Sequence, residues 1–307
     1  MVGKKQNYNA EFFYEKAFQK LEHEVLNINS YNGVNHELIQ RYLHTRTNVF
    51  NFLLSNFWIN NQIQNIVDKY DPDIILIFKG ELLSQQTIER LSQSRNVYLF
   101  YPDTFKFKPL IKNRISYYKK VFTASNNKNF YYLLGAKSVV TVPWACDPDF
   151  HKRNNISKSY AVTFIGTAYF ERRILINNLR NVEVFGEFWF GRRSHKPVYG
   201  EEFVNIINKS LINLNLQARI SILADAPTMR TFEVAGCGGF QISDYMPSLK
   251  QYFPMIPTFK HLADLKDQIA YFLESRDEAA EIANKTMEIC YTKYKYTDSA
   301  KKILANL

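Results

Sequence analysis

The sequence contains little cysteine and no long apolar run. Its three cysteines, Cys146, Cys237 and Cys290, form no CxxC pair and no Cys/His metal spacing. Nothing therefore indicates a disulfide framework or a zinc site, and a reducing compartment fits best. No stretch reaches the ~18 uninterrupted apolar residues of a membrane-spanning helix, and the opening MVGKKQNYN lacks the apolar core of a signal peptide. These absences predict a cytoplasmic protein.

Glycine, proline and acidic residues are also sparse. The sequence has only 11 Gly and 10 Pro in 307 residues, which excludes collagen-like and low-complexity chains. Its 46% hydrophobic residues can bury at least one core, and its length suggests about two domains. Lys and Arg outnumber Asp and Glu by 39 to 29, a net charge of +10. This excess favours an anionic partner: a nucleotide, a phosphorylated sugar, nucleic acid or a lipid headgroup surface.

Apolar strand patterns alternate with helical patterns along the chain. The run Ile74–Phe78 is short, β-branched and stopped by Gly80, which is typical of a buried strand in a parallel sheet. Comparable strand patterns occur at 96–103, 119–125, 138–148, 160–166, 182–186, 210–216 and 239–244, with a helical tail from about 262 to 305. The alternation predicts two Rossmann-like α/β domains, residues 1–150 and 151–307, with parallel sheets facing one another across a ligand-binding cleft.

The segment APTMRTFEVAGCGGFQISD at 226–244 is the most informative part of the sequence. Pro227 favours a first helical turn, and the glycines from Gly236 onward predict a helix that ends before a strand. Arg230 and Glu233 are three residues apart and share one helix face. On that face a guanidinium can pair with a phosphate while a carboxylate accepts hydrogen bonds from ribose hydroxyls. The alternative is a surface ion pair of little energetic value.

A second candidate is VTFIGTAYFERR at 162–173, an apolar strand that enters a turn and then a helix. Gly166 followed by the small Thr167 permits close approach of a phosphate to the backbone, and Arg172 or Arg173 could neutralise it. An ordinary strand-to-helix connection with solvated arginines is the alternative, because a single glycine is a weak signal.

Two further segments of the second domain carry candidate donor contacts. In VFGEFW, Gly186 ends a strand and could admit a nucleobase against the backbone, with Phe188 or Trp189 available for stacking, although core packing explains these aromatics equally well. In SLINLNL, Asn213 and Asn215 point to the same side of a strand and would be costly in a core unless they are hydrogen-bonded.

The first domain offers one candidate for catalysis. Asp103 follows the strand at 96–103 and could act as a general base toward an acceptor hydroxyl, although a turn-forming Asp after Pro is the simpler interpretation. Comparable candidates end the preceding strand: Lys79, Gly80 and Glu81. The basic and aromatic stretch 101–120 also allows a module that binds nucleic acid or an anionic surface.

In order and spacing, these segments resemble the CgeB-type (spore maturation protein) glycosyltransferase-like family, which is related to the group 1 glycosyltransferases of GT-B fold. The segments PDIILIFKGELLS, LGAKSVVTVPWACDPDFH, VTFIGTAYFERR, VEVFGEFW, INLNL and RTFEVAGCGGFQISDY carry the resemblance, and the R-x-F-E-x-x-x-x-G-G core is the most specific of them. Family members usually begin with an apolar strand that ends in glycine. This chain has only MVGKK before its first helix, so we expect the first domain either to lack a central strand or to be shortened.

The resemblance implies a nucleotide-sugar donor bound by the second domain, an acceptor bound by the first, a terminal helix that crosses back to the first, and no bound metal or other cofactor. It places Glu233 on the donor ribose and Arg230, with Arg172 or Arg173, near the diphosphate. The expected donor-binding residues are Gly166, Thr167, Arg172, Arg173, Gly186, Asn215, Arg230 and Glu233.

The implied activity is the transfer of a sugar from a nucleoside diphosphate sugar to an acceptor hydroxyl, in the modification of a glycan or of a cell-surface or spore polysaccharide. Two alternatives stay open at this point: a related protein that binds nucleotide without turnover, and the basic binding module. Peripheral contact with an anionic membrane surface is compatible with the enzyme, whereas nucleic acid is the less favoured partner.

Overall fold

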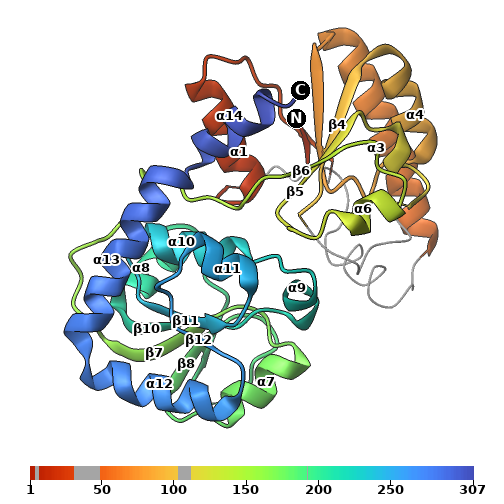
Figure 1. Ribbon diagram of the computed structural model, residues 1–307. Helices are drawn as coiled ribbons and strands as arrows, with labels where there is room; N and C mark the ends of the chain where they lie inside the picture. The colour runs from red at the N-terminus through yellow and green to blue at the C-terminus, as the bar shows by residue number, and fades with distance from the viewer. Residues whose placement is uncertain (4–6, 31–48, 103–111, 192) are drawn as a thin grey trace. The chain divides into compact units, whose positions relative to one another are not determined.

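The computed structural model describes residues 1–3, 7–30, 49–102, 112–191 and 193–307, without the side chains of 49–58. These residues separate into two compact units (Figure 1). Unit 1 comprises Met1–Val142 together with Lys302–Leu307, and unit 2 comprises Pro143–Lys301. Within the described residues, no helix combines the length and the apolar character needed to span a bilayer.

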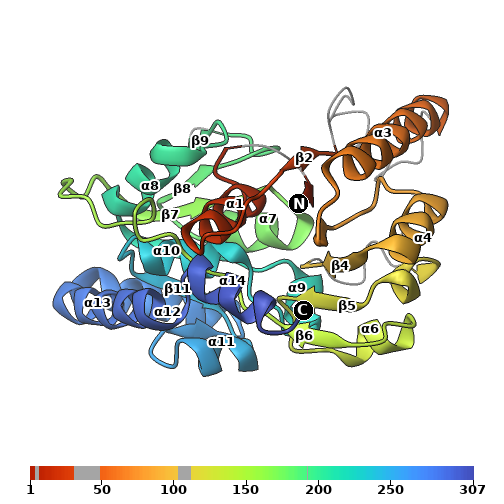
Figure 2. The same ribbon diagram turned by 90° about the horizontal axis from the view of Figure 1, so that it is seen from above.

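Unit 1 contains, among its described residues, a six-stranded parallel sheet in the order β2-β1-β3-β4-β5-β6. Its elements are β1 (Val2–Gly3), α1 (Ala10–Lys20), β2 (Ile28–Asn29), α3 (Val49–Tyr70), β3 (Ile74–Phe78), α4 (Gln85–Ser94), β4 (Asn96–Phe100), η2 (Ile115–Tyr117), β5 (Lys120–Thr123), α6 (Asn129–Leu133) and β6 (Val139–Thr141). Helix α1 lies on one face of the sheet, and α3 and α4 lie on the other (Figures 1 and 2). Because both faces are covered, β3 and β4 consist almost entirely of buried apolar residues.

The opening of the chain differs from the expectation. A missing central strand is one of the two expectations for the first domain, but β1 lies between β2 and β3 and pairs with both. It has only two residues, so it is too short for any periodicity to reveal it.

Unit 2 contains a second six-stranded parallel sheet among its described residues, in the order β12-β11-β10-β7-β8-β9. Its elements are β7 (Tyr160–Ile165), α7 (Phe170–Asn177), β8 (Val182–Phe185), β9 (Ser194–His195), α8 (Gly200–Lys209), β10 (Ser210–Asn215), α9 (Arg219–Leu223), α10 (Met229–Gly236), β11 (Gln241–Asp244), α11 (Pro247–Tyr252), β12 (Thr258–Phe259), α12 (Leu262–Glu274) and α13 (Arg276–Lys293). The core combines β7, β10 and β11 with α12, as in the contact cluster of Phe164, Leu214, Ile242 and Phe272.

The connection order of unit 2 determines where a ligand can bind. β7 is the first strand of its sheet in the chain and lies in the middle, beside β10; the chain builds outward from β7 to β9 and then outward from β10 to β12. Loops that leave β7 and β10 therefore diverge to opposite faces of the sheet. Ligands of open α/β sheets bind in the crevice that such a switch point leaves at the carboxyl ends of the strands.

The terminal helix α14 (Tyr296–Leu304) begins in unit 2, whereas the last six residues belong to unit 1. Within unit 1, the Lys120 ammonium group donates to the Asn306 carbonyl oxygen. The expected return of the terminal helix to the first domain is thus present. The prediction of two parallel α/β sheets is also confirmed.

Candidate functional site

Helix α10 presents Arg230 and Glu233 near the carboxyl edge of the unit 2 sheet. It begins at Met229 after the N-cap residue Thr228, so Pro227 precedes the helix instead of lying in its first turn. It ends at Gly236 and leads into β11, as the sequence predicts. The Thr228 side chain makes no capping hydrogen bond, and the positive end of the helix dipole therefore remains available to an anion.

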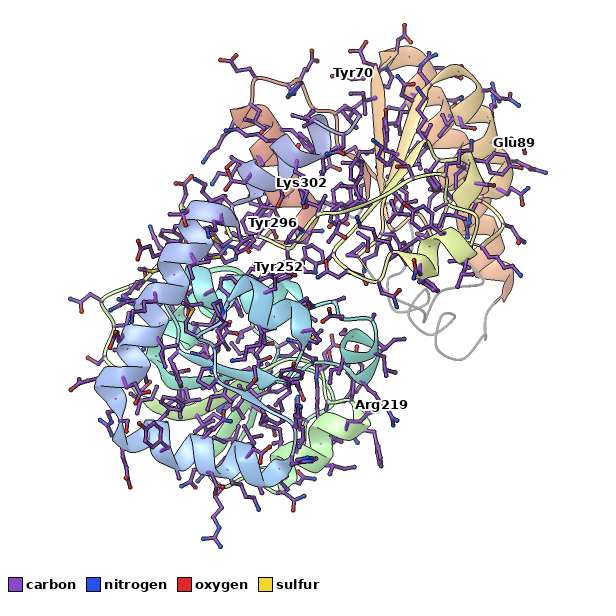
Figure 3. All side chains as sticks on the ribbon, viewed as in Figure 1. Tyr70, Glu89, Arg219, Tyr252, Tyr296 and Lys302 are labelled. Atoms are coloured by element: carbon purple, nitrogen blue, oxygen red, sulfur yellow. The ribbon has the colours of Figure 1, made fainter. Side chains whose placement is uncertain are left out.

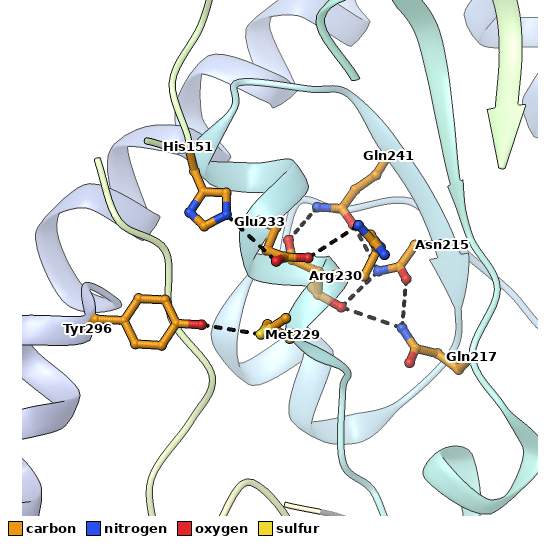
Figure 4. Close-up of polar contacts among 9 residues, drawn as sticks. His151, Asn215, Gln217, Met229, Arg230, Glu233, Gln241 and Tyr296 are labelled. Carbon is orange, nitrogen blue, oxygen red and sulfur yellow. Dashed lines mark hydrogen bonds and ion pairs between the residues drawn. The ribbon is translucent and has the colours of Figure 1, made fainter. Parts of the chain in front are cut away.

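Glu233 is a buried carboxylate between two basic groups. It is 4% exposed, with Oε2 3.4 Å from Arg230 Nη1 and Oε1 3.6 Å from His151 Nε2 (Figure 4). Burial by itself raises the pKa of the Glu233 carboxyl group, but Arg230 and His151 lower it by more, so the pKa lies below its ordinary value. The i,i+3 pair is therefore not the solvated surface pair of the alternative interpretation.

A backbone hydrogen bond fixes the orientation of the His151 ring. The backbone N–H of Asp147 donates to His151 Nδ1 at 3.0 Å, so the ring proton is on Nε2, the atom that faces Glu233. The residue is fully buried. Tyr291 on α13 fixes this loop, because its hydroxyl donates to the His151 and Gly236 carbonyl oxygens at 2.8 and 2.9 Å.

Arg230 is held in place by an aromatic ring. Its guanidinium carbon lies 4.1 Å from the centre of the Phe203 ring on α8, a cation–π contact. About a third of the Arg230 side chain is exposed, in contrast with the buried Glu233. Phe203 and Glu233 therefore position the Arg230 guanidinium, and solvent can reach its charge.

Arg172 spans the switch point between β7 and β10. Its Nε donates to the Leu216 carbonyl oxygen after β10 at 2.9 Å, and its Nη1 donates to the Thr167 carbonyl oxygen after β7 at 3.1 Å. Burial lowers the pKa of the Arg172 guanidinium, and the charge of Arg230 adds to this effect, whereas Tyr169, Asp244 and Glu171 act against it. Among the described residues no carboxylate lies within ion-pair distance of Arg172.

The other arginine of α7 has a different position. Arg173 is exposed and donates from Nη2 to the Phe188 carbonyl oxygen at 3.0 Å. The sequence offered Arg172 or Arg173 as the phosphate ligand, and Arg172 is the one that reaches the switch point beside Arg230.

Gly166 and Gly186 pack against each other at the ends of β7 and β8. A Cβ atom on Gly186 would lie 2.1 Å from the Gly166 carbonyl oxygen, so only glycine fits there. The indole Nε1 of Trp189 donates to the same oxygen at 2.7 Å, and its ring meets Phe164 edge-on. Gly186 and Trp189 thus shape the turn around Gly166. Of the two residues considered for stacking on a base, Phe188 and Trp189, only Phe188 is exposed, at 63%.

Asn215 is a centre of buried hydrogen bonds. Its Nδ2 donates to Thr231 Oγ1 at 2.8 Å and to Gln241 Oε1 at 3.0 Å, and its Oδ1 accepts from Gln217 Nε2 at 3.0 Å (Figure 4). Asn213 is likewise buried and donates to the Phe240 carbonyl oxygen. The expectation that both amides need hydrogen bonds is met, and the Asn215 bonds fix the first turn of α10 against the sheet.

Asp103, the residue expected to act as the base, lies outside the described residues. In unit 1, Glu81 is buried and follows the turn at Lys79 and Gly80, both with positive φ angles of 62° and 73°. Arg114 clamps this turn by donating to the Gly80 and Glu81 carbonyl oxygens.

Sequence reasoning missed three residues of the unit 2 site: His151, Phe203 and Asp244. Asp244 ends β11, and its Oδ2 accepts from the Gln217 N–H at 2.7 Å. Burial raises the pKa of the Asp244 carboxyl group to about 6, although this bond and Arg172 act against the rise. A polar residue at the carboxyl end of a buried strand is a signal that could have found Asp244. No local pattern pairs His151 or Phe203 with α10.

The two parallel sheets and their helices have the GT-B fold of glycosyltransferases, to which solved structures correspond over most of the chain. Residues 170–305 match the model of a family described as glycosyl transferase-like. No sequence among the curated proteins matches the chain.

Particular structures confirm the fold. A trehalose-6-phosphate synthase, OtsA, superimposes with a TM-score of 0.67 at 8% identity, over 99% of this chain and 98% of that one. Sucrose-phosphate synthase from Thermosynechococcus elongatus gives 0.64 at 10% identity, over 92% and 84%. HepE from Anabaena, solved in complex with UDP-glucose, gives 0.61 at 10% identity, over 81% and 82%.

Proposed function

We propose that the protein is a GT-B glycosyltransferase that transfers a sugar from a nucleoside diphosphate sugar to an acceptor hydroxyl in the cytoplasm. One observation carries the proposal. At the switch point of unit 2 the charge of Arg230 acts on Arg172, which makes no ion pair within the described residues and whose nearest acids, Asp244 and Glu171, offset this repulsion only in part. Two adjacent cations in partial burial repel each other, so such a pair is best stabilised by a ligand with two negative charges, such as a diphosphate.

The surrounding residues support specific roles in this proposal. Arg172 and Arg230 bind the diphosphate and stabilise its charge as the sugar departs, a role that needs no bound metal in this mechanism. Glu233 keeps Arg230 oriented. Because its contacts with Arg230 and His151 are long and a carboxylate offers about four acceptor positions, Glu233 can also accept hydrogen bonds from ribose hydroxyls.

The finer parts of the proposal rest on the sequence resemblance. These are the CgeB-type (spore maturation protein) assignment, an acceptor bound by unit 1, Asp103 as the base, and a glycan or cell-surface polysaccharide as the product. HepE was solved with UDP-glucose, which suggests that uridine nucleotides are the first donors to test.

The test is a thermal-shift and calorimetric panel of nucleoside diphosphates and their sugars. We expect at least one of them to raise the melting temperature. We expect Arg230→Ala to weaken its binding by roughly tenfold to a hundredfold, because a hydrogen bond between charged groups contributes about 1.5–3 kcal/mol. Glu233→Gln retains the shape of the site and should also weaken binding. Arg180→Ala is the matched control, since this exposed arginine precedes β8 and so lies at the amino ends of the strands, away from the proposed site at their carboxyl ends.

Two results would count against the proposal. If no nucleotide changes the melting temperature of any variant, unit 2 is not a donor-binding domain. If nucleotide binds and depends on Arg230 but no donor is hydrolysed or transferred, the protein is the nucleotide-binding relative without turnover.

A further inference from the structure

The second half of unit 1 has cations without acidic residues to balance them. Residues 104–142 include eight Lys and Arg and no Asp or Glu. The last six residues of the chain, which join unit 1, add Lys302. Five of these lysines are exposed on described residues, and four of them form what we call the basic edge: Lys119, Lys128, Lys137 and Lys302; the fifth is Lys112.

The topology places these lysines together. β6 is the edge strand of the sheet, and Val121 of β5 pairs with Val139 of β6. Lys119 and Lys137 each lie two residues before these partners, so they occupy neighbouring positions at the start of the two parallel strands. At the other end of β5, the charge of Lys128 adds to the effect of burial in lowering the pKa of Lys302, a residue labelled in Figure 3.

No acid in the described part of the chain relieves this repulsion. None of its ion pairs includes any of the four lysines of the basic edge. Like charges at neighbouring strand positions are unfavourable. The edge therefore gains stability when an anionic surface approaches it.

An apolar tip projects from the same edge. Leu133, at the end of α6, is 86% exposed, the highest value among the large hydrophobic residues that the structure describes, and the adjacent Tyr132 is 47% exposed. The helix lies between Lys128 and Lys137 in the sequence. A Cβ on Gly135 would lie 3.9 Å from Ile115 and from Ser116, which places the end of α6 over the segment that leads to Lys119.

We propose that the basic edge and its tip, Tyr132 and Leu133, dock unit 1 on a bilayer that contains anionic lipid. Each Lys near an anionic bilayer contributes about 1 kcal/mol, and a projecting Leu and Tyr can enter the headgroup region. Lysines also protect edge strands from pairing with other chains, but that role needs no exposed leucine among them. Single-stranded nucleic acid is bound by several stacked aromatic faces, whereas the tip here has one aromatic ring, Tyr132, beside the more exposed aliphatic Leu133.

The experiment is co-sedimentation of the full chain with vesicles of phosphatidylcholine alone or with 30% phosphatidylglycerol, at roughly 0.1 M salt. We expect binding only to the anionic vesicles, and weaker binding as salt increases. Lys119→Glu/Lys137→Glu should reduce the partition coefficient at least tenfold. Leu133→Ser should reduce it several-fold at unchanged charge. The matched controls are Lys196→Glu/Lys266→Glu and Leu223→Ser, two exposed lysines and an exposed leucine of unit 2.

The proposal fails if the wild-type chain does not bind anionic vesicles. It also fails if the double lysine variant or Leu133→Ser binds these vesicles as well as its control does. Competition by single-stranded nucleic acid for these lysines, with no effect of Leu133→Ser, would equally contradict it. The nucleotide-induced thermal shift, measured on the same variants, checks that each one folds. Since that shift depends on unit 2, it separates a failure of membrane docking from a failure of the proposed function.

Discussion

The Asp244 carboxyl group lies at the end of β11, and its pKa is shifted upward. Its pKa rises from 3.8 to about 6, chiefly because the group is buried. A raised carboxyl pKa means that the folded state holds the proton more tightly than the unfolded state does. Protonated Asp244 therefore stabilises the folded state fully below pH 4, and this contribution is lost as the pH rises to about 6. Above that pH the ionised group costs up to about 3 kcal/mol.

Asp244→Asn should remove this cost. We expect the free energy of unfolding at pH 7.5 to increase by about 1–3 kcal/mol, less whatever the weaker hydrogen bond from Gln217 loses, and the gain to disappear below pH 4. Urea unfolding at several pH values measures it. Parallel pH profiles for the variant and the wild type would show that Asp244 is not the titrating group.

At the scale of elements, the contact between Gly166 and Gly186 ties the turn after β7 to the end of β8. A Cβ on Gly186 meets backbone atoms at 2.1 and 2.7 Å, which cannot move without displacing the strand. A Cβ on Gly166 meets only the Phe164 ring at 3.0 Å and the Arg172 side chain at 3.4 Å. Both glycines lack a positive φ, so steric fit alone distinguishes them.

Gly186→Ala is therefore expected to lower the free energy of unfolding by about 3 kcal/mol, and Gly166→Ala by about 1 kcal/mol or less. Denaturant unfolding of both variants makes the comparison. An equal decrease in the free energy of unfolding for both variants would mean that β7 and β8 can move apart at this point to accommodate a Cβ atom.

At the scale of the whole molecule, the two sheets divide the expected functions. The cations that we assign to the diphosphate lie in unit 2, whereas the basic edge lies in unit 1. Hydrogen exchange with a bound nucleoside diphosphate should slow within residues 166–173 and 215–233 and stay unchanged within 119–141, because the ligand contacts only the former. Protection confined to 119–141 would instead place the nucleotide on the basic edge.

The longer elements were predictable because their patterns are local. The apolar run Ile74–Phe78 and the RTFE helix both fall where the sequence places them. The two-residue strands β1, β9 and β12 and the short helices α9 and α11 were not foreseen, since so few residues show no periodicity.

For the site, the sequence by itself determined which residue types could bind a diphosphate: arginines and a glutamate close to glycine-bearing strand ends. Only the tertiary structure placed Arg172 at the switch point, bonded Asn215 to the first turn of α10, and brought His151 and Phe203 to Glu233 and Arg230. The physical reason is that a helical or strand pattern depends on neighbours along the chain. The partners of a buried charge come instead from segments distant in the sequence, which the connections between strands bring next to it.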